Sequence, residues 1–250
     1  MIKGKNMKAT IKTLFIILWV ITVSSAQELI TDRPDYTESA QVIPAKMIQI
    51  ESGFEYSDFY SIEELSFPNA LARIGVGYNL ELRLGFLGWI SNNSNYYLND
   101  LLLELKYRIT DEQSEFPIAL MLVSTLPTGD SKVSVGDPEI GIKAATGYDI
   151  NDQFEIGINF GSIYSKGEDE PEFLNLASAA LGIGISDKLG MFLELFAEMP
   201  GNDVWQPVLD GGFTFLITDQ AQLDFYVGKG LNDYSPDLII GAGLSVLFGY

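Results

Sequence analysis

The sequence predicts an all-β protein, a transmembrane antiparallel up-and-down β-barrel of about 12 strands. Three observations indicate this fold. Apolar and polar residues alternate through successive segments of roughly ten residues, the length that a tilted transmembrane strand requires. The connections between these segments are short and long in turn. Glycines and charged residues share the face opposite the large apolar side chains.

The alternation is clearest in the C-terminal segment, residues 238–250. One face carries Ile240, Ala242, Leu244, Val246, Phe248 and Tyr250, and the other carries Gly241, Gly243, Ser245, Leu247 and Gly249. Successive side chains of a strand point to opposite faces. The apolar face therefore suits contact with lipid, and the small face suits a crowded or water-filled lumen.

Earlier segments show the same period. In each, apolar residues lie on one face and a charged residue lies on the other. In chain order the examples are Ile48 and Ile50 opposite Glu51, Ile74 and Val76 opposite Arg73, Leu82 and Leu84 opposite Arg83, Leu103 and Leu105 opposite Glu104, and Ile140 and Ile142 opposite Lys143. Residues 117–126 are so uniformly apolar that their facing stays open. The predicted strands are 47–56, 69–78, 80–87, 100–109, 117–126, 138–148, 154–164, 174–185, 189–198, 208–216, 222–230 and 238–250.

The connections between these strands predict the topology. Short turns fall at 78–79, 110–115, 149–153, 186–188 and 218–221, and longer loops fall at 57–68, 88–99, 127–137, 165–172, 199–207 and 231–236. Short turns on one rim and long loops on the other are typical of outer-membrane barrels, whose short turns are periplasmic. An even number of strands places both ends of the barrel in the periplasm.

A soluble sandwich or lipocalin-like barrel also has alternating strands. Such a fold would pack the apolar stripes into one core and leave the glycines as the outer surface. Exposed glycine on so many strands would weaken the sheet, and no gain in stability would offset that cost. The opposite assignment, with the apolar stripes facing lipid, is therefore favoured.

Residues 1–26 have the layout of a cleaved secretory signal peptide. Lys3, Lys5, Lys8 and Lys12 precede an apolar run, which ends in small residues at 24–26. The run is too short to span a bilayer as a helix. The sequence thus predicts export to the outer membrane, where the remaining chain has membrane lipid as its surroundings.

Composition excludes several functions. Four of the 15 Lys and Arg residues lie in the signal segment, so 11 remain against 34 Asp and Glu, a net charge of −23. Nucleic-acid partners require basic patches, so none is expected. The absence of Cys and His excludes zinc sites and catalytic pairs built on those residues. We expect no enzyme, no metal and no cofactor.

Charged residues on the inward face form the candidate constriction. These are Glu51, Arg73, Glu81, Arg83, Glu104, Lys106, Arg108, Glu194, Glu198 and Asp224. Rings of charged side chains select solutes in pores. Alternatively, the same residues are cross-strand pairs that fill the lumen.

A polar leader, residues 27–45, precedes the barrel at 46–250. Pro34 and Pro44 prevent it from joining the sheet as a central strand. Its polar side chains, which include Arg33, Asp35 and Glu38, could not be satisfied by lipid. We expect the leader to fold into the periplasmic mouth as a plug, with Arg33 paired to inward carboxylates such as Glu51 or Glu194. The alternative is a loose tail.

Three segments carry a family resemblance: Thr31-Asp-Arg-Pro-Asp-Tyr-Thr-Glu-Ser39, Leu126-Pro-Thr-Gly-Asp130 and Gly136-Asp-Pro-Glu-Ile-Gly-Ile-Lys143. They resemble bacterial outer-membrane proteins of the phenol-degradation meta-pathway family, over nearly all of the chain after residue 26. The resemblance implies a channel for small, hydrophobic or aromatic compounds. Tyr250 resembles the terminal aromatic signal read by the outer-membrane assembly machinery. The alternative function is a non-transporting barrel with a structural or partner-binding role.

Overall fold

The computed structural model describes residues 29–249, with the exception of 61, 93–94, 112 and 168–169. The predicted signal peptide, the first two residues of the leader and Tyr250 lie outside the described residues. Among the described residues, no helix has the length and apolarity needed to cross a membrane.

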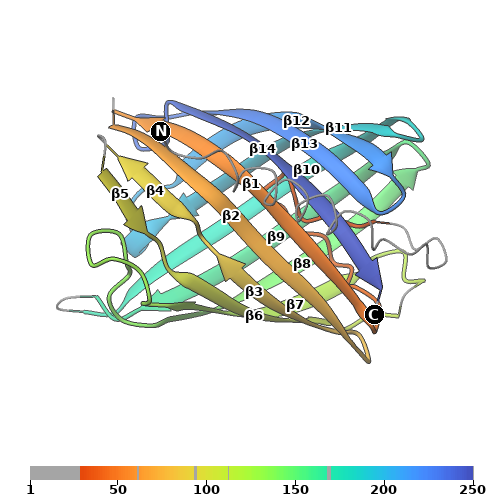
Figure 1. Cartoon of the computed structure of the whole chain (residues 1–250), viewed down its shortest axis with the longest axis horizontal. Helices are drawn as coiled ribbons and strands as arrows, with labels where there is room; N and C mark the ends of the chain where they lie inside the picture. Colours follow the sequence, from red (N-terminus) through yellow and green to blue (C-terminus); the bar gives the residue numbers. More distant parts are fainter. Residues whose placement is uncertain (1–28, 61, 93–94, 112, 168–169, 250) are drawn as a thin grey trace, which may run out of the picture.

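The chain forms a closed antiparallel barrel (Figure 1). Its strands are β1 (Met47–Phe59), β2 (Ile62–Gly77), β3 (Leu80–Phe86), β4 (Trp89–Asn92), β5 (Asn95–Leu98), β6 (Leu101–Arg108), β7 (Ile118–Leu126), β8 (Glu139–Asn151), β9 (Phe154–Ser165), β10 (Glu172–Ser186), β11 (Leu189–Met199), β12 (Gln206–Thr218), β13 (Ala221–Gly230) and β14 (Leu238–Gly249). A 3-10 turn, η1 (Pro200–Asn202), connects β11 to β12. Each strand pairs with its neighbours, and β1 closes the barrel on β14 and β2.

Fourteen strand segments make 12 barrel strands. Both β3 and β4 pair with β2, so they are two parts of one strand that is interrupted around Gly88, whose φ is +91°. Glycine tolerates this left-handed conformation. The short β5 pairs with β4 and leads into β6 in the same way. The predicted strand number is confirmed.

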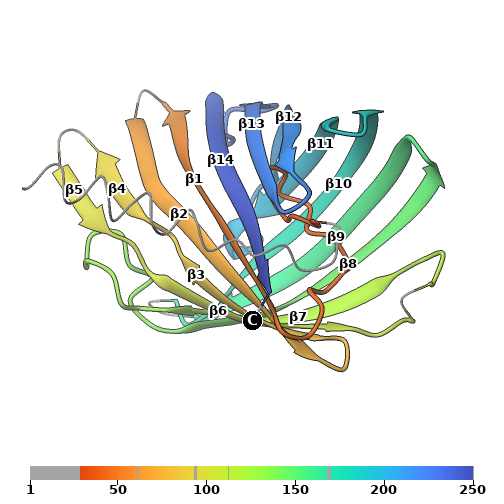
Figure 2. The ribbon, with the colours of Figure 1, turned by 45° about the vertical axis from the view of Figure 1, so that its right-hand side comes forward.

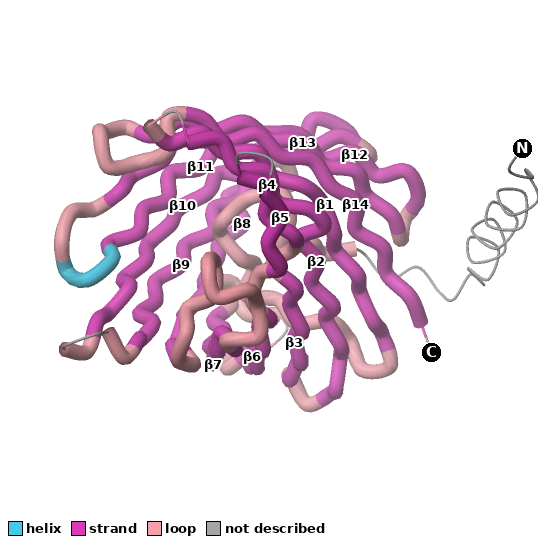
Figure 3. The backbone as a smooth tube through the Cα atoms, turned by 60° about the vertical axis from the view of Figure 1, so that its left-hand side comes forward, coloured by secondary structure: helices cyan, strands magenta, loops and turns pink. Residues whose placement is uncertain are grey.

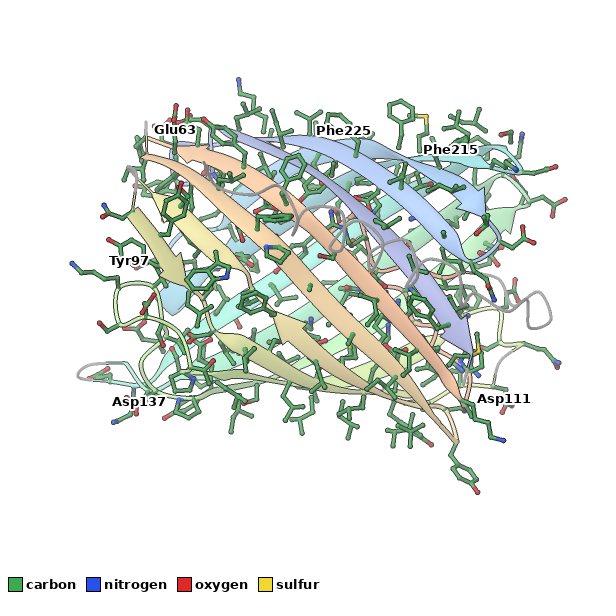
Figure 4. All side chains as sticks on the ribbon, viewed as in Figure 1. Glu63, Tyr97, Asp111, Asp137, Phe215 and Phe225 are labelled. Atoms are coloured by element: carbon green, nitrogen blue, oxygen red, sulfur yellow. The ribbon has the colours of Figure 1, made fainter. Side chains whose placement is uncertain are left out.

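The burial pattern is inverted relative to a soluble protein. Along β6, Leu103 and Leu105 are exposed, whereas Glu104, Lys106 and Arg108 are buried. Labelled Phe215 and Phe225 likewise point away from the barrel (Figure 4). The strand β7, whose facing the sequence left open, buries Ala119, Met121 and Val123 and exposes the leucines between them. A lipid-facing exterior and a polar lumen explain this pattern.

Two predicted loops were wrong. Residues 57–68 and 88–99 fold mostly as strand, because β1 and β2 extend to Phe59 and from Ile62, and β4 and β5 form a hairpin. The aromatic and β-branched residues in 57–68, which include Phe59 and Ile62, favour strand. The labelled residues Glu63, Tyr97 and Asp137 mark this end of the barrel, opposite Asp111 (Figure 4).

The short connections lie together at the opposite end. The turn between β2 and β3 consists of Tyr78 and Asn79, both with positive φ, at 56° and 61°. Met47 at the start of β1 pairs with Gly249 of β14 at this same end. Figure 3 shows the strands as a continuous wall with loops at both rims.

Candidate functional site

The lumen contains the leader. From residue 29 the chain runs inside the barrel wall before it reaches β1 (Figure 2). Apolar contacts hold both ends of this segment, because Leu29 and Ile43 pack against Leu247 of β14. Near its middle, Ala40 packs against Ala119 and Met121 of β7. The leader therefore enters and leaves the lumen at the end of the barrel where β1 begins.

One side of the lumen carries alternating charges. This charged-pair wall comprises Glu51, Arg73, Glu81, Arg83, Glu104, Lys106 and Lys143. Arg73 is its centre: the guanidinium lies 2.8 Å from Glu81 Oε1 and 3.0 Å from Glu51 Oε1. Both pairs are buried, and they connect β1, β2 and β3 across the register.

Two leader carboxylates complete this wall. Asp32 Oδ2 lies 3.1 Å from the Arg73 guanidinium and 2.9 Å from Arg83 Nη2. Glu38 forms ion pairs with Arg83 and with Lys143. A buried cation without a partner is costly, so these leader carboxylates balance wall charges that neighbouring strands leave uncompensated.

The electrostatics of Glu38 reflect this position. Burial alone would raise the pKa of its carboxyl group, but Arg83 and Lys143 hold the pKa well below its usual range. The same competition, with Arg73 as the strongest cation, lowers the pKa of Asp32. Both leader groups are therefore charged at neutral pH.

The other side of the lumen, the acidic wall, comprises Glu55, Glu194, Glu198, Asp210 and Asp224. Glu194 of β11 accepts backbone N–H groups of the leader, from Tyr36 at 2.6 Å and from Thr37 at 2.7 Å. It also accepts the Thr37 hydroxyl. The Tyr36 hydroxyl donates to Glu198 at 2.7 Å. Glu194 thus holds the leader backbone at Tyr36 and Thr37, and Glu198 holds the Tyr36 side chain.

Arg33 pairs with an inward carboxylate, as the sequence predicts, but the partner is Asp224 of β13 and neither of the two examples, Glu51 and Glu194. Its Nη2 lies 2.9 Å from Oδ1, and Nε lies 3.2 Å from Oδ2. Glycine makes this approach possible, because a Cβ at Gly243 would lie 2.4 Å from the Arg33 side chain. Gly53 borders the same guanidinium, so the space left by two glycines places Arg33 against Asp224.

Asp35 is a leader carboxyl group that faces other acidic residues. It lies beside Glu194 and Asp210, and burial together with Glu194 raises the pKa of Asp35 well above its usual range. The leader therefore carries one carboxyl group that resists ionisation, unlike Asp32 and Glu38. Asp35 differs from them because it faces the acidic wall.

A cavity of about 180 Å³ lies between the leader and the acidic wall. Its lining includes three carboxylates, those of Asp35, Glu55 and Asp210, and three aromatic rings, those of Tyr36, Phe196 and Tyr226. Arg33 also contributes to the lining. We refer to it as the lumen cavity.

The structure brings the predicted constriction residues into one lumen. Glu51, Arg73, Glu81, Arg83, Glu104, Lys106, Arg108, Glu194 and Asp224 are all buried there, and Glu198 lies beside them through Tyr36. Arg108 donates to Gln41 of the leader at 2.6 Å. Their side chains contact the leader as well as one another.

The site also includes two further inward-facing charged residues, Lys143 and Asp210, and two uncharged residues, Asn159 and Thr37, that the candidate constriction omitted. Asn159 exchanges hydrogen bonds with the Glu38 backbone at 2.7 and 2.9 Å. Lys143 lies 3.1 Å from Glu104, the Thr37 hydroxyl donates to Ser178, and Asp210 lines the lumen cavity. Their inward position follows from the period-two pattern. A rule that selected only recurrent charges overlooked an amide and a hydroxyl. Within the part of the chain that the structure describes, no group of three acidic residues is arranged to hold a metal ion.

Solved structures share this architecture. The COG4313 outer membrane channel from Pseudomonas putida F1 matches with a TM-score of 0.64 and 13% identity, over 87% of this chain and 100% of that chain. The NanC porin matches with a TM-score of 0.59 and 10% identity, over 80% of this chain and 98% of that one. The KdgM porin matches at 0.58 and 8%, over 79% and 98%.

These likenesses show the fold of an outer-membrane barrel. A comparison with curated proteins finds no match. The family comparison is more specific, because one family model matches residues 31–248 and so covers the leader and the barrel together. The chain belongs to the family described as "Putative MetA-pathway of phenol degradation".

Proposed function

We propose that this protein is an outer-membrane channel for small hydrophobic or aromatic compounds and that its leader restricts passage through the lumen. The observation that carries the proposal is the leader itself, held inside the barrel by contacts to both walls. Ion pairs join Asp32 and Glu38 to one wall, and Arg33 to the other.

The contacts are of a kind that can be released. They are ion pairs and hydrogen bonds between a short segment and a rigid barrel, whereas each barrel strand pairs with two neighbours along its length. Segments with few ladder hydrogen bonds are the parts of proteins that open locally at low cost. A barrel of this size would conduct when such a segment leaves the lumen, because barrels of 12 strands lie between filled and open ones.

The solute class rests on the family description and on the structural neighbours. The family is described by phenol degradation, and the similar solved structures include an outer membrane channel and porins. Aromatic side chains at Tyr36, Phe196 and Tyr226 line the lumen cavity. They offer apolar contact to an aromatic solute.

A non-transporting barrel is the second candidate. The dense ion pairing of Arg73, Arg83 and Glu104 inside the lumen favours it, because ion pairs between neighbouring strands rigidify the lumen that they fill. Deletion of residues 27–38 separates the two proposals. A channel restricted by its leader gains conductance in planar bilayers and solute uptake in cells, while the barrel still assembles. A structural barrel gains neither.

The predicted signal peptide and the role of Tyr250 belong to the same proposal. Export requires a signal peptide that is removed, and barrel assembly requires a signal at the C-terminus. Tyr250→Ala should lower the amount of barrel in the outer membrane without changing the conductance of each inserted molecule.

A further inference from the structure

The lining of the lumen cavity contains more acidic than basic residues. Its one cationic lining residue, Arg33, is already neutralised by Asp224 at 2.9 Å. Among the described residues, no Lys or Arg lies at ion-pair distance from Glu55 or Asp210. Glu55 and Asp210 therefore lack a cationic partner among the described residues, and a cation supplied from outside the chain would provide one.

Asp210 is the lining residue that most clearly lacks a hydrogen-bond donor. The residue is 6% exposed, and its Oδ1 is buried without a hydrogen-bond partner within the described structure. Its carboxyl group lies beside Glu194, a second acid. A buried acceptor without a donor costs free energy. A donor placed in the cavity that Asp210 lines would remove that cost.

The aromatic rings suit the rest of such a ligand. Tyr36 and Phe196 are stacked, with centroids 4.5 Å apart and planes inclined by 5°, and Tyr226 forms another part of the lining. The Tyr226 hydroxyl donates to Glu55 at 2.6 Å, which fixes both groups at the cavity edge. Aromatic faces attract cations and apolar rings alike.

The size of the cavity limits the ligand. A cavity of about 150 Å³ holds a benzene molecule, and the lumen cavity measures about 180 Å³. One six-membered ring with a short substituent fills that volume. A larger solute would require displacement of Pro34 or Asp35 in the leader.

We propose that the lumen cavity binds a small organic ammonium ion that carries one aromatic ring. The ammonium group donates to Asp210, with Glu55 and Asp35 nearby, and the ring packs against Tyr36, Phe196 and Tyr226. The inference deepens the proposed function by naming a solute class, but equilibrium binding tests it without transport.

The probes are benzylammonium chloride and its neutral analogue benzyl alcohol. Binding of each to the purified full-length mature protein in detergent is measured by calorimetry, with protein-free micelles as the blank. We expect benzylammonium to bind about tenfold or more tightly than benzyl alcohol, since both can donate a hydrogen bond but only the ammonium group carries a charge that the carboxylates attract. Asp210→Asn should lower the benzylammonium affinity about tenfold and leave that of the alcohol unchanged. Asp152→Asn, in the exposed turn after β8, is the matched control.

Equal affinities for the two probes would overturn the proposal, as would undiminished benzylammonium binding by an Asp210→Asn variant. The proposal would also be overturned if neither probe bound. Thermal unfolding of each variant establishes that the barrel is intact, and Glu55→Gln gives a second test if Asp210→Asn does not fold. Binding with no conductance in any variant would leave the cation site standing and contradict the channel.

Discussion

Arg33 and Asp224 are 191 positions apart in the chain and form a two-point ion pair inside the barrel. The Arg33 guanidinium also lies 6.0 Å from the Tyr226 ring centroid. Asp224 is fully buried, and the Arg33 side chain is 16% exposed. This contact fixes the leader to β13, while Asp32 and Glu38 fix it to the opposite side.

Removal of the Arg33 side chain should open the lumen. Arg33→Ala leaves Asp224 buried without a partner, which costs on the order of 3 kcal/mol in the docked state of the leader. The leader should therefore spend more time outside the lumen, and single-channel conductance in planar bilayers should rise several-fold. Antibiotic sensitivity of cells that carry the variant should rise in parallel.

Two controls separate this effect from a general loss of charge. Lys166→Ala removes an exposed pair with Asp137 and should leave conductance unchanged, since exposed pairs contribute little. Asp224→Ala added to Arg33→Ala should have much less effect than the sum of the single changes. Additive changes would show that the two residues act independently.

A glycine on β14 tests the same contact without touching either charge. In Gly243→Ala the new Cβ would lie 2.4 Å from the Arg33 side chain, so Arg33 must leave Asp224. We expect conductance to rise toward that of Arg33→Ala, with normal barrel assembly. Gly184→Ala is the control, because its Cβ would meet its nearest neighbour at 3.8 Å. A conductance gain in Gly184→Ala but not in Gly243→Ala would refute the role of Gly243 in holding Arg33 against Asp224.

Asp35 predicts a pH dependence. Its pKa is raised in the docked leader by burial and by Glu194, with Asp210 and Asp32 as further acidic neighbours. A raised pKa means that the contribution of Asp35 to docking is complete at low pH and is lost as pH rises through the docked-state pKa. Conductance should therefore rise with pH in the wild type.

Asp35→Asn should remove that part of the pH dependence and keep conductance low at the upper end of the range. The measurement is a series of bilayer recordings from acidic to alkaline pH with both proteins. A wild-type conductance that falls with increasing pH would contradict the sign. Glu38 does not interfere, because its pKa is well below its usual range and it stays charged throughout.

The lipid-facing assignment of Leu103 predicts a stability effect. Leu103→Arg places a charge on the exposed face of β6, where the side chain is 40% exposed. Arg on the lipid face of a barrel costs about 2 to 4 kcal/mol near the bilayer midplane. Urea titration of the protein folded in liposomes should show a loss of that order. Val135→Arg, in the loop before β8, should cost far less.

Most of the barrel was predictable because its signal is periodic. Leu101 to Arg108 alternate apolar and charged residues without exception after Leu102, and the strand facing follows from that pattern alone. The extended hairpin around Tyr60 was missed. Residues 57–68 were predicted to form a loop, whereas cross-strand pairs decide whether an extended segment continues its ladder.

The lumen was less predictable, since period-two patterns say which residues face inward and nothing about which ones meet. Arg33 illustrates the limit. Any of several inward carboxylates satisfied its charge, and the choice of Asp224 depends on the space that Gly53 and Gly243 leave. Asp32 contacts two arginines, but nothing in the sequence distinguishes it from the other acidic residues of the leader.

The central claim is that the leader restricts the channel from inside the barrel. The Thr37 hydroxyl and the Ser178 hydroxyl lie 2.7 Å apart, one on the leader and the other on β10. The chain has no cysteine, so Thr37→Cys with Ser178→Cys offers a single reversible cross-link. Introduced together with Arg33→Ala, this pair allows the leader to be locked or released in one protein.

Single-channel conductance of that triple variant, recorded before and after reduction, tests the claim most directly. We predict that the disulfide forms in the folded barrel, that the oxidised protein conducts no more than the wild type, and that reduction raises conductance to the level of Arg33→Ala. Equal conductance in the oxidised and reduced protein, with the cross-link verified, would show that the leader does not restrict passage.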